Sequence, residues 1–474
     1  MIQAFSSYLQ DKCLINSVQF VLLGVSGGAD SMCLLDIFLK ISHKVAVGHF
    51  NHQLREDAAG DAVFVQNYAS TRGVACYVGK GNVAEYASTH RLSEEEAGRQ
   101  LRYAFLFDTA VRIGADAVAV AHNADDQVET VLMHLLRGAG LDGLSGMRPR
   151  TIFPAWSPSI PLARPLLGTR RAEIEAYCAE NRIPYRTDPT NTHLDYFRNR
   201  LRHTIIPLLM RESPALHTRV EYMTDTLAAD RDVLDTYTDD TMKSICVEIR
   251  PGVMCLERDA FSALPLGMQR RVVRRVVAQV QPDARDAGFD VVARAVDGIA
   301  QGMTQFDLIG GVRGVSVGEV AYIHRQDIPI WTSEEFPQLP DDTARHLSIP
   351  GEVELASGWR ITAEVLPRAS LPAPSADVAC LDADGVGDSV WVRGRVSGER
   401  FSPLGMGTHA VKLSDLMINE KLPEPLRKGW PLIVVGEQVV WVPRLGRSGE
   451  FVISEATSQG VVFRLVPPTP RRSD

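Results

Sequence analysis

The chain has 474 residues, of which 45% are hydrophobic and 23% are charged, and its formal net charge is -8. This composition is typical of a globular protein of two to four domains and excludes a wholly disordered chain. No segment approaches the roughly 20 uninterrupted apolar residues of a membrane helix, and the first residues lack a basic stretch followed by an apolar one. We therefore expect a cytosolic protein without a membrane contact.

The first part of the chain, residues 1–213, alternates short apolar runs with helical patterns, as parallel α/β sheets do. The predicted strands are Phe20–Val25, Val45–Phe50, Ala75–Val78, Ala117–Ala121 and a segment near Leu162. The predicted helices are Met32–Lys40, Asp57–Arg72, Glu94–Ile113, Asp125–Arg137 and Arg170–Arg182. Together they predict a doubly wound α/β domain with a parallel sheet.

The pattern then changes twice. Residues 214–326 contain the long amphipathic stretches Leu216–Val247 and Leu266–Val280 and a strand-like pair around Gly311–His324, which predicts a mainly helical second domain. Residues 327–345 are rich in proline and acidic residues and are predicted to be a linker. Residues 346–467 are predicted to form a small β-rich (α+β) third domain, followed by a tail at 468–474. Its strand-like runs are Gly351–Leu366, Val390–Val396, Leu432–Val435 and Val439–Pro443.

The seven cysteines are scattered along the chain, and no two of them form a C-x-x-C pair. This usage argues against a disulfide framework, a zinc knuckle and an iron–sulfur site. The acidic net charge alone disfavours nucleic acid as a partner. Phosphate backbones respond to local basic patches, however, so net charge does not decide the question.

The run V-S-G-G-A-D-S at residues 25–31 lies where an apolar strand is followed by a helix. Glycines let backbone amides approach an anion, the helix N-terminus adds partial positive charge, and serine hydroxyls donate hydrogen bonds. We therefore predict a phosphate cradle. Its residues are Ser26, Gly27, Gly28, Ala29, Asp30 and Ser31. The lysine of a Walker A loop is missing, which disfavours an ordinary P-loop NTPase.

Two further polar clusters follow predicted strands: H-F-N-H-Q-L-R at residues 49–55 and H-N-A-D-D-Q-V-E-T at residues 122–130. The carboxyl ends of parallel strands lie on one edge of a sheet, so the three motifs are expected to converge. Taken singly, a histidine here is more often buried or capping, and an aspartate often caps a helix. Their convergence predicts that His49 and His122 border a nucleotide. It also predicts that Asp30, Asp125 and Asp126 are catalytic and that Asp30 and Asp125 hold Mg²⁺.

The run at residues 26–31 resembles the S-G-G-x-D-S motif of the PP-loop ATP pyrophosphatases. Members of that superfamily hold the pyrophosphate part of ATP while a substrate oxygen attacks the α-phosphorus, which implies AMP as the product. The wider pattern resembles the long, three-domain tRNA(Ile)-lysidine synthetases. The matching segments are 95–103, 125–130, 135–144, 164–167, 188–191, 198–202, 398–403 and 411–416.

This resemblance implies that ATP adenylates the C2 carbonyl oxygen of the wobble cytidine in a CAU-anticodon tRNA(Ile). Free L-lysine then displaces AMP, and no protein partner is required. Positive charge is needed around the transferring phosphoryl group, and Arg99, Arg102 and Arg137 are the candidates, Arg99 as a catalytic residue. Either Glu129 or Asp126 is expected to hold the lysine. The expected substrate-binding residues are Glu129, Arg102, Arg137, Arg198, Arg202 and Lys412.

Two alternatives stay open on the sequence. A PP-loop enzyme that thiolates a tRNA base is disfavoured because such reactions often use paired cysteines or an iron–sulfur cluster. A nucleotide-binding protein without catalysis is disfavoured because the cradle residues occur together with Asp125 and Asp126.

Overall fold

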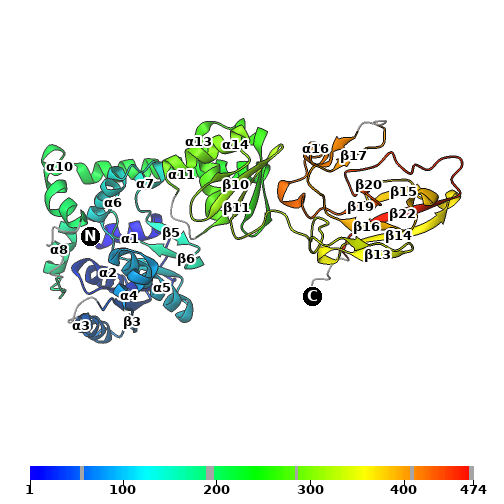
Figure 1. Cartoon of the computed structure of the whole chain (residues 1–474). Coiled ribbons are helices and arrows are strands. Elements are labelled where there is room, and N and C mark those ends of the chain that lie inside the picture. The colour runs from blue at the N-terminus through cyan, green and yellow to red at the C-terminus, as the bar shows by residue number, and fades with distance from the viewer. Residues whose placement is uncertain (54–57, 188–196, 283–286, 406–409, 469–474) are drawn as a thin grey trace. The chain divides into compact units, whose positions relative to one another are not determined.

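The computed structural model describes residues 1–53, 58–187, 197–282, 287–405 and 410–468 (Figure 1). The motif residues 54, 55 and 188–191 and the first residue of the predicted helix 57–72 lie outside this set. The chain folds into two compact units, residues 1–236 and 237–474. The predicted boundaries of three domains, a linker and a tail stay predictions. Within the described part of the chain, no helix is long and apolar enough to cross a membrane.

The first unit is built on a sheet whose strands run in the order β3-β2-β1-β4-β6-β5. Its strands are β1 (Val21–Gly24), β2 (Val45–Asn51), β3 (Cys76–Lys80), β4 (Ala117–Val120), β5 (Arg150–Phe153) and β6 (Ser157–Ala163). The strands β3, β2, β1 and β4 each pair in parallel with the next strand in this order, whereas β5 pairs antiparallel with β6. The predicted parallel strands are confirmed, and the antiparallel edge strand β5 was not predicted.

Helices follow most of the strands of this sheet (Figure 1). They are α1 (Ile2–Asp11), α2 (Ala29–Lys40), α3 (Ala58–Ser70), α4 (Val83–His90), α5 (Glu94–Ile113), α6 (Ala124–Leu136), α7 (Leu141–Leu144), α8 (Arg171–Glu180), α9 (Phe197–Arg200), α10 (Ile206–Glu212) and α11 (Leu216–Ile245). A π-helical turn, η2 (Leu201–Ile205), joins α9 to α10. The five predicted helices of this unit are confirmed within a few residues at their ends, whereas α1, α4, α7, α9 and α10 were not predicted.

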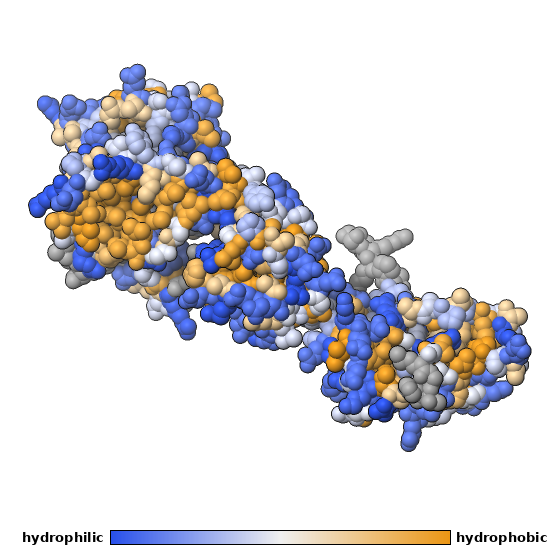
Figure 2. Space-filling view, turned by 90° about the horizontal axis from the view of Figure 1, so that it is seen from above, coloured by the Kyte–Doolittle hydropathy of each residue, from blue (hydrophilic) through white to orange (hydrophobic). Residues whose placement is uncertain are grey.

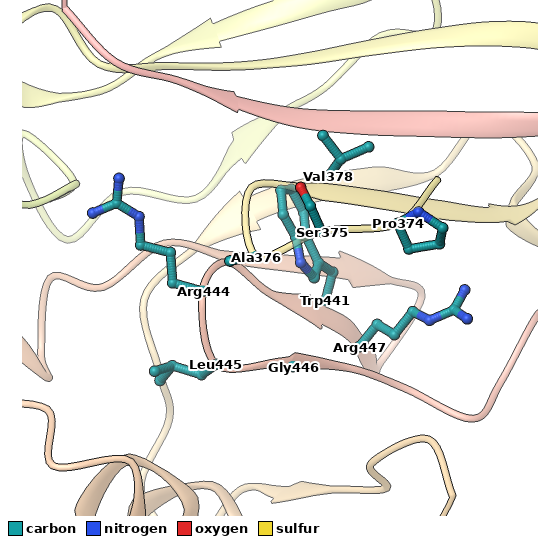
Figure 3. Close-up of a pocket in the computed structure, with 9 residues that line it drawn as sticks. All are labelled: Pro374, Ser375, Ala376, Val378, Trp441, Arg444, Leu445, Gly446 and Arg447. Atoms are coloured by element: carbon teal, nitrogen blue, oxygen red, sulfur yellow. The ribbon is translucent and has the colours of Figure 1, made fainter. Parts of the chain in front are cut away.

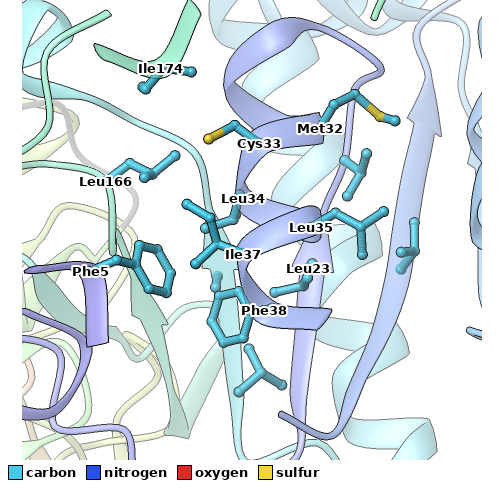
Figure 4. Packing of buried hydrophobic residues seen from close by; sticks show 14 of the residues in the cluster. Phe5, Leu23, Met32, Cys33, Leu34, Leu35, Ile37, Phe38, Leu166 and Ile174 are labelled. Carbon is cyan, nitrogen blue, oxygen red and sulfur yellow. The ribbon is translucent and has the colours of Figure 1, made fainter. Parts of the chain in front are cut away.

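The sheet is covered on both faces, which explains the continuous apolar runs of its central strands. Successive side chains of a strand point to opposite faces. Val21 and Leu23 belong to the core that also contains residues of α1, α2 and α8, and Leu22 belongs to the core that contains residues of α5. Figure 4 shows the first of these cores, where the rings of Phe5 and Phe38 meet edge to face at 5.4 Å. The doubly wound prediction is therefore confirmed.

The strand order reverses at β1, because β1 lies between β2 and β4 while the chain reaches β4 only after β3. Ligands of open α/β sheets bind at such a switch point, outside the carboxyl ends of the strands. The loops after β1 and β4 therefore adjoin, and they carry residues 25–31 and 121–126.

The second unit begins within α11 and continues with a five-stranded sheet of order β7-β8-β11-β10-β9. Its elements are β7 (Cys246–Arg250), β8 (Val253–Glu257), α12 (Arg258–Ser262), α13 (Leu266–Val280), α14 (Phe289–Gln301), β9 (Phe306–Asp307), β10 (Val312–Val317) and β11 (Val320–Arg325). The mainly helical character and the β10–β11 pair are confirmed. The predicted helix 216–247 ends two residues early, because residues 246 and 247 already pair with β8 across a turn at Gly252 (φ 82°).

The remainder of the second unit is β-rich, as predicted. It contains β12 (Arg345–His346), β13 (Gly351–Glu354), β14 (Arg360–Pro367), β15 (Val378–Asp382), α15 (Ala383–Val386), β16 (Val390–Arg393), β17 (Arg400–Phe401), β18 (Val411–Lys412), α16 (Leu413–Asn419), β19 (Leu432–Val435), β20 (Gln438–Val442), β21 (Gly446–Arg447) and β22 (Gln459–Val466), with short 3-10 turns at 356–358, 368–370 and 424–426. The strands form antiparallel sheets of order β12-β16-β19-β20-β21 and β13-β14-β22-β15. The central strand β22 was not predicted. Within residues 327–345, Trp331 and Phe336 pack against the core that contains Trp430, and Leu339 is buried.

Candidate nucleotide and substrate site

The loop between β1 and α2 is closed by its own hydroxyl groups. The Ser31 hydroxyl oxygen accepts the N–H groups of Ser26 and Gly27 at 3.1 and 3.2 Å and donates to the Gly28 carbonyl at 3.0 Å. Gly27 has φ 94°, a conformation that favours glycine. The loop ends at the N-cap Gly28, and Ala29 begins α2. This is the predicted juxtaposition of a glycine turn with a helix N-terminus, and its anion-binding role stays a prediction.

Asp30 lies in the first turn of α2, and its Oδ1 atom is buried without a hydrogen-bond partner among the described residues. Burial raises the pKa of Asp30 from 3.8 to about 6; the charge of Arg171 opposes the rise and that of Asp126 adds to it. A buried carboxylate oxygen without a partner is costly unless a cation or donor completes it. Asp30 is therefore equipped to receive a group that the protein itself does not supply.

The two predicted nucleotide-bordering histidines are both poorly exposed and differ in their partners. The Nδ1 atom of His49 lies 2.9 Å from the Val25 carbonyl, which ties β2 to the start of the cradle. Burial lowers the pKa of His49. Burial also lowers the pKa of His122 well below its ordinary range, and the charges of neighbouring arginines, Arg164 foremost, act in the same direction. Both imidazoles are therefore neutral at physiological pH.

Residues at the start of α6 form a tight hydrogen-bonded cap. The Asn123 side chain accepts the Asp126 N–H at 3.0 Å, and Asp126 Oδ2 accepts the Asn123 N–H at 3.1 Å. Asp125 faces other elements: its Oδ1 accepts from His217 Nε2 at 3.0 Å, and its Oδ2 accepts the Arg171 N–H at 2.8 Å. Burial acts to raise the pKa of Asp125, but these hydrogen bonds outweigh it, and the pKa lies below its ordinary value. The metal-binding role predicted for Asp125 stays a prediction.

Three predicted substrate-binding residues meet in one ion-pair network. Glu129, a residue that is 0% exposed, accepts from Arg198 Nε at 3.0 Å and from Arg202 Nε at 2.6 Å. Arg202 also reaches Asp126 at 3.3 Å, and Arg198 reaches Glu95 at 2.9 Å. Arg202 is part of the π-helical turn η2, a geometry found frequently at functional sites. The sequence predicted the members of this network but not their pairing.

The other predicted cationic residues are distributed unevenly. Arg99 and Arg102 lie over the ring of Tyr103, at 5.2 and 5.3 Å from its centroid, and neither has an ion pair with a described residue. Arg137 is exposed and follows the last residue of α6, roughly 18 Å along the helix from its first residue. Lys412 is exposed in the second unit, at the N-cap of α16. The structure therefore brings Arg99 and Arg102 near His122 but leaves Arg137 at the far end of α6.

Two residues near the site were not assigned a site role from the sequence. His217 contacts Asp125, and nothing in its sequence context marks it. Arg164 is 2% exposed and donates from Nη1 to the Arg148 carbonyl at 2.7 Å and to Thr151 Oγ1 at 3.1 Å. Arg164 lies directly after the buried strand β6, and only that place in the sequence marks it as an inward-facing residue.

A separate pocket of about 270 Å³ lies in the β-rich part of the second unit (Figure 3). Trp441 lies in it, with Ser375 nearby and Arg444 and Arg447 at its sides. Arg444 Nε donates to Asp377 at 2.9 Å, and Arg447 Nη1 donates to the Cys380 carbonyl at 3.1 Å. Both guanidinium groups are thus held by protein acceptors. This pocket contains none of the predicted site residues.

Comparisons with known proteins connect this geometry to a family. A model of the PP-loop domain matches residues 3–209, and a model of the TilS substrate C-terminal domain matches residues 390–464. A tRNA(Ile)-lysidine synthase of Dehalococcoides mccartyi is 34% identical, with 97% of this chain and 98% of that protein covered. The chain belongs to the tRNA(Ile)-lysidine synthase family. Relatives of the same name from Geobacter sulfurreducens and Symbiobacterium thermophilum are 33% and 32% identical, with 94% and 93% of this chain and 93% and 92% of those proteins covered.

Membership of the tRNA(Ile)-lysidine synthase family confirms the resemblance drawn from the sequence motifs. It also places the cradle in a PP-loop domain, and proteins with this domain form a family of ATP-using enzymes.

Proposed function

We propose that the protein joins free L-lysine to C2 of the wobble cytidine in a CAU-anticodon tRNA(Ile), converting ATP to AMP and pyrophosphate through an adenylated base. One observation carries the proposal. In a chain of this family, a glycine loop closed by hydroxyl groups adjoins a cluster of arginines and carboxylates at one edge of the sheet.

The cradle is suited to the pyrophosphate part of ATP. The N-terminus of α2 supplies partial positive charge and free N–H groups, and the two serine hydroxyls adjust to phosphate oxygens. Mg²⁺ fits beside it, because Asp30 Oδ1 is a buried acceptor without a partner in the described chain and the Asp126 charge acts on it. Mg²⁺ is usually held by one or two carboxylates together with substrate phosphates. Bound there, it would neutralise charge on the departing pyrophosphate.

We assign Asp30 and Asp126 as the residues that would hold this ion. Asp125 is assigned a supporting role, without contact to the ion. Both carboxylates already accept hydrogen bonds at both oxygens, Asp125 from His217 at 3.0 Å and Arg171 at 2.8 Å. Asp126 accepts from Asn123 at 3.1 Å and from Arg202 at 3.3 Å. We prefer Asp126 to Asp125 because the charge of Asp126 acts to raise the pKa of Asp30.

Arg99 and Arg102 are the proposed cations for the transferring α-phosphoryl group. They border His122 together with Arg164, and no carboxylate of the described residues neutralises either one. Charge that develops on phosphoryl oxygens is best stabilised by donors held in place before the reaction. The neutral His122 ring, on which the charges of these arginines act, adds a hydrogen-bonding group without further positive charge.

The network around Glu129 fits an amino-acid zwitterion. A free lysine brings one carboxylate and one α-ammonium group, and the network offers the arginines 198 and 202 for the first and the carboxylates of Glu129 and Asp126 for the second. The attacking ε-amine has an ordinary pKa near ~10.4 and must be neutral to react. Nearby arginine charge lowers the pKa of an amine, so the same residues favour the reactive form.

Contacts with tRNA are proposed for exposed cations that the fold does not already neutralise. Arg137 and Lys412 are exposed and have no ion pair with described residues. Other basic residues are engaged within the protein: Arg148 pairs with Asp232 at 2.6 Å, and Lys428 pairs with Asp342 at 2.6 Å. Folded RNA is recognised chiefly through its shape and phosphates, and the target base is splayed into the pocket.

The test is pyrophosphate release from ATP with transcripts that differ only at the wobble base. We expect release with a CAU-anticodon tRNA(Ile) and none with the UAU-anticodon transcript. A protein that binds nucleotide without catalysis releases none with either. Release that depends on a sulfur donor and not on cytidine would favour the thiolating alternative, although Cys33 and Cys178, which share a hydrogen bond, are both buried.

A further inference from the structure

His217 is the second residue of α11 and contacts the nucleotide site from outside the motif-bearing loops. It is 8% exposed, its Nε2 donates to Asp125 Oδ1 at 3.0 Å, and its Nδ1 is buried without a partner in the described chain. The second Asp125 oxygen accepts the N–H of Arg171, the first residue of α8. One carboxylate therefore joins the beginnings of three helices, α6, α8 and α11.

The residue next to Asp125 is the one that faces the cradle. Asp126 closes the cap of α6 with Asn123, reaches Arg202 at 3.3 Å, and acts by its charge on Asp30. Ala124, on the other side of Asp125, donates its N–H to the Thr169 carbonyl at 2.9 Å. The backbone of residues 124–126 is thus held from both sides, and displacement of Asp125 would displace Asp126 with it.

We propose that His217 is a positioning residue for adenylation. By donating to Asp125 it fixes the start of α6 and so keeps Asp126 directed toward Asp30. This inference rests on the proposed function for its rate effects. His217 touches no substrate in this account and acts only through Asp125.

Docking of α11 on the first unit does not depend on His217 alone. Arg231 Nη1 donates to Ser145 Oγ at 2.8 Å and to the Asp142 carbonyl at 3.2 Å. Asp225, which also lies on α11, pairs with Lys12 at 2.9 Å. A variant that removes the Arg231 contacts weakens the same docking at a distance from Asp125. Arg231→Ala is therefore a matched control for a purely structural role of His217.

The experiment compares His217→Ala, His217→Gln and Arg231→Ala in the full chain. Loss of a group that orients a metal or catalytic ligand typically costs about 10- to 100-fold in activity or metal affinity. We expect His217→Ala to lower kcat for tRNA-dependent pyrophosphate release in that range and to raise the Mg²⁺ concentration needed for half-maximal rate. His217→Gln, whose amide can donate to Asp125, should recover most of the rate. Arg231→Ala should stay near the wild-type rate, even if its Tm falls.

Hydrogen exchange of the Arg171 amide supplies a readout that does not depend on activity. This N–H bonds to Asp125, so its exchange should accelerate in His217→Ala and not in Arg231→Ala. Equal rates and equal exchange in the two alanine variants would overturn the proposal, as would a glutamine variant as impaired as the alanine variant. If the wild type releases no pyrophosphate, the proposed function fails, and the Arg171 exchange alone then decides whether His217 positions Asp125.

Discussion

Asp30→Asn is expected to make the protein more stable and catalytically inactive at the same time. The asparagine side chain has nearly the same size as the aspartate but carries no charge. The buried Asp30 carboxylate lacks a partner for Oδ1, and its pKa is raised from 3.8 to about 6. Above that pH, the free protein holds an incompletely compensated negative charge, and the substitution removes it.

The size and sign of the effect follow from linkage. A carboxyl group whose pKa is higher in the folded than in the unfolded chain lowers the stability of the folded state as pH rises through the interval between the two values. Moving the pKa from 3.8 to about 6 corresponds to a loss of up to about 3 kcal/mol above pH 6. At pH 5 about half of this loss is present. For a unit of this size, 3 kcal/mol corresponds to a Tm difference of up to about 10 °C.

The assay is thermal unfolding of the wild type and the variant at pH 7.5 and pH 5, without ATP or tRNA, followed by pyrophosphate release at pH 7.5. We expect a higher Tm for Asp30→Asn at pH 7.5, a smaller difference at pH 5, and no release. Asp30→Ala should likewise lose ATP turnover while remaining folded. A variant that is no more stable than the wild type at pH 7.5, or that releases pyrophosphate at the wild-type rate, would refute the reasoning.

Three further predictions concern the ion-pair network and the tRNA. Burial raises the pKa of Glu129, so its own charge is costly, but Glu129→Gln should still lower the Tm, because it leaves Arg198 and Arg202 without their shared partner and breaking a buried ion pair costs about 3 kcal/mol or more; an unchanged or higher Tm would show that the burial cost of the Glu129 charge outweighs the pairs. Binding of tRNA should weaken steeply with salt, because the logarithm of the binding constant falls with the logarithm of the salt concentration by about 0.9 per neutralised phosphate of a duplex. An affinity that is flat up to physiological salt would exclude exposed cations such as Arg137 and Lys412 as contacts. Truncation after residue 326 should raise the tRNA concentration needed for half-maximal rate far more than the ATP concentration, and equal effects on both, in a folded sample, would remove the tRNA-binding role of the C-terminal region.

The truncation point follows from the packing of residues 327–345. This stretch is rich in proline and acidic residues and was predicted to be a linker, yet Trp331 and Phe336 pack against the core around Trp430. A cut beyond residue 330 would separate these aromatic side chains from that core. Composition indicates where a chain tends to be exposed, whereas the packing of single aromatic residues depends on the tertiary structure.

The first unit was largely predictable because its signals are local. Apolar runs of four to seven residues reveal buried parallel strands, and glycine and serine before a helix reveal the cradle. Short elements such as α4 and the edge strand β5 carry weaker periodicity and were missed. The first two residues of β7 were predicted as helix, because residues 246 and 247 continue an apolar helical pattern and only their pairing with β8 makes them part of a strand.

Site residues were predictable as a set but not in their pairing. Motif residues such as Asp30, Asp125 and Asp126 converge because of strand order, which the α/β pattern implies. The inward direction of Arg164 and the contact of His217 with Asp125 arise from tertiary packing between segments far apart in the chain. Large apolar side chains that remain exposed, such as Leu135, Leu136 and Leu208, were likewise unpredictable, and Figure 2 shows hydrophobic areas on the visible face of the first unit.

The most direct test of the central claim is incorporation of lysine into RNA. The full chain is incubated with ATP, Mg²⁺, radiolabelled L-lysine and a CAU-anticodon tRNA(Ile) transcript, and the RNA is then isolated and counted. We expect label in the RNA at the wobble cytidine, dependent on ATP and accompanied by equimolar AMP, and no label in the Asp30→Asn reaction. RNA that stays unlabelled while an active family member labels the same transcript would contradict it.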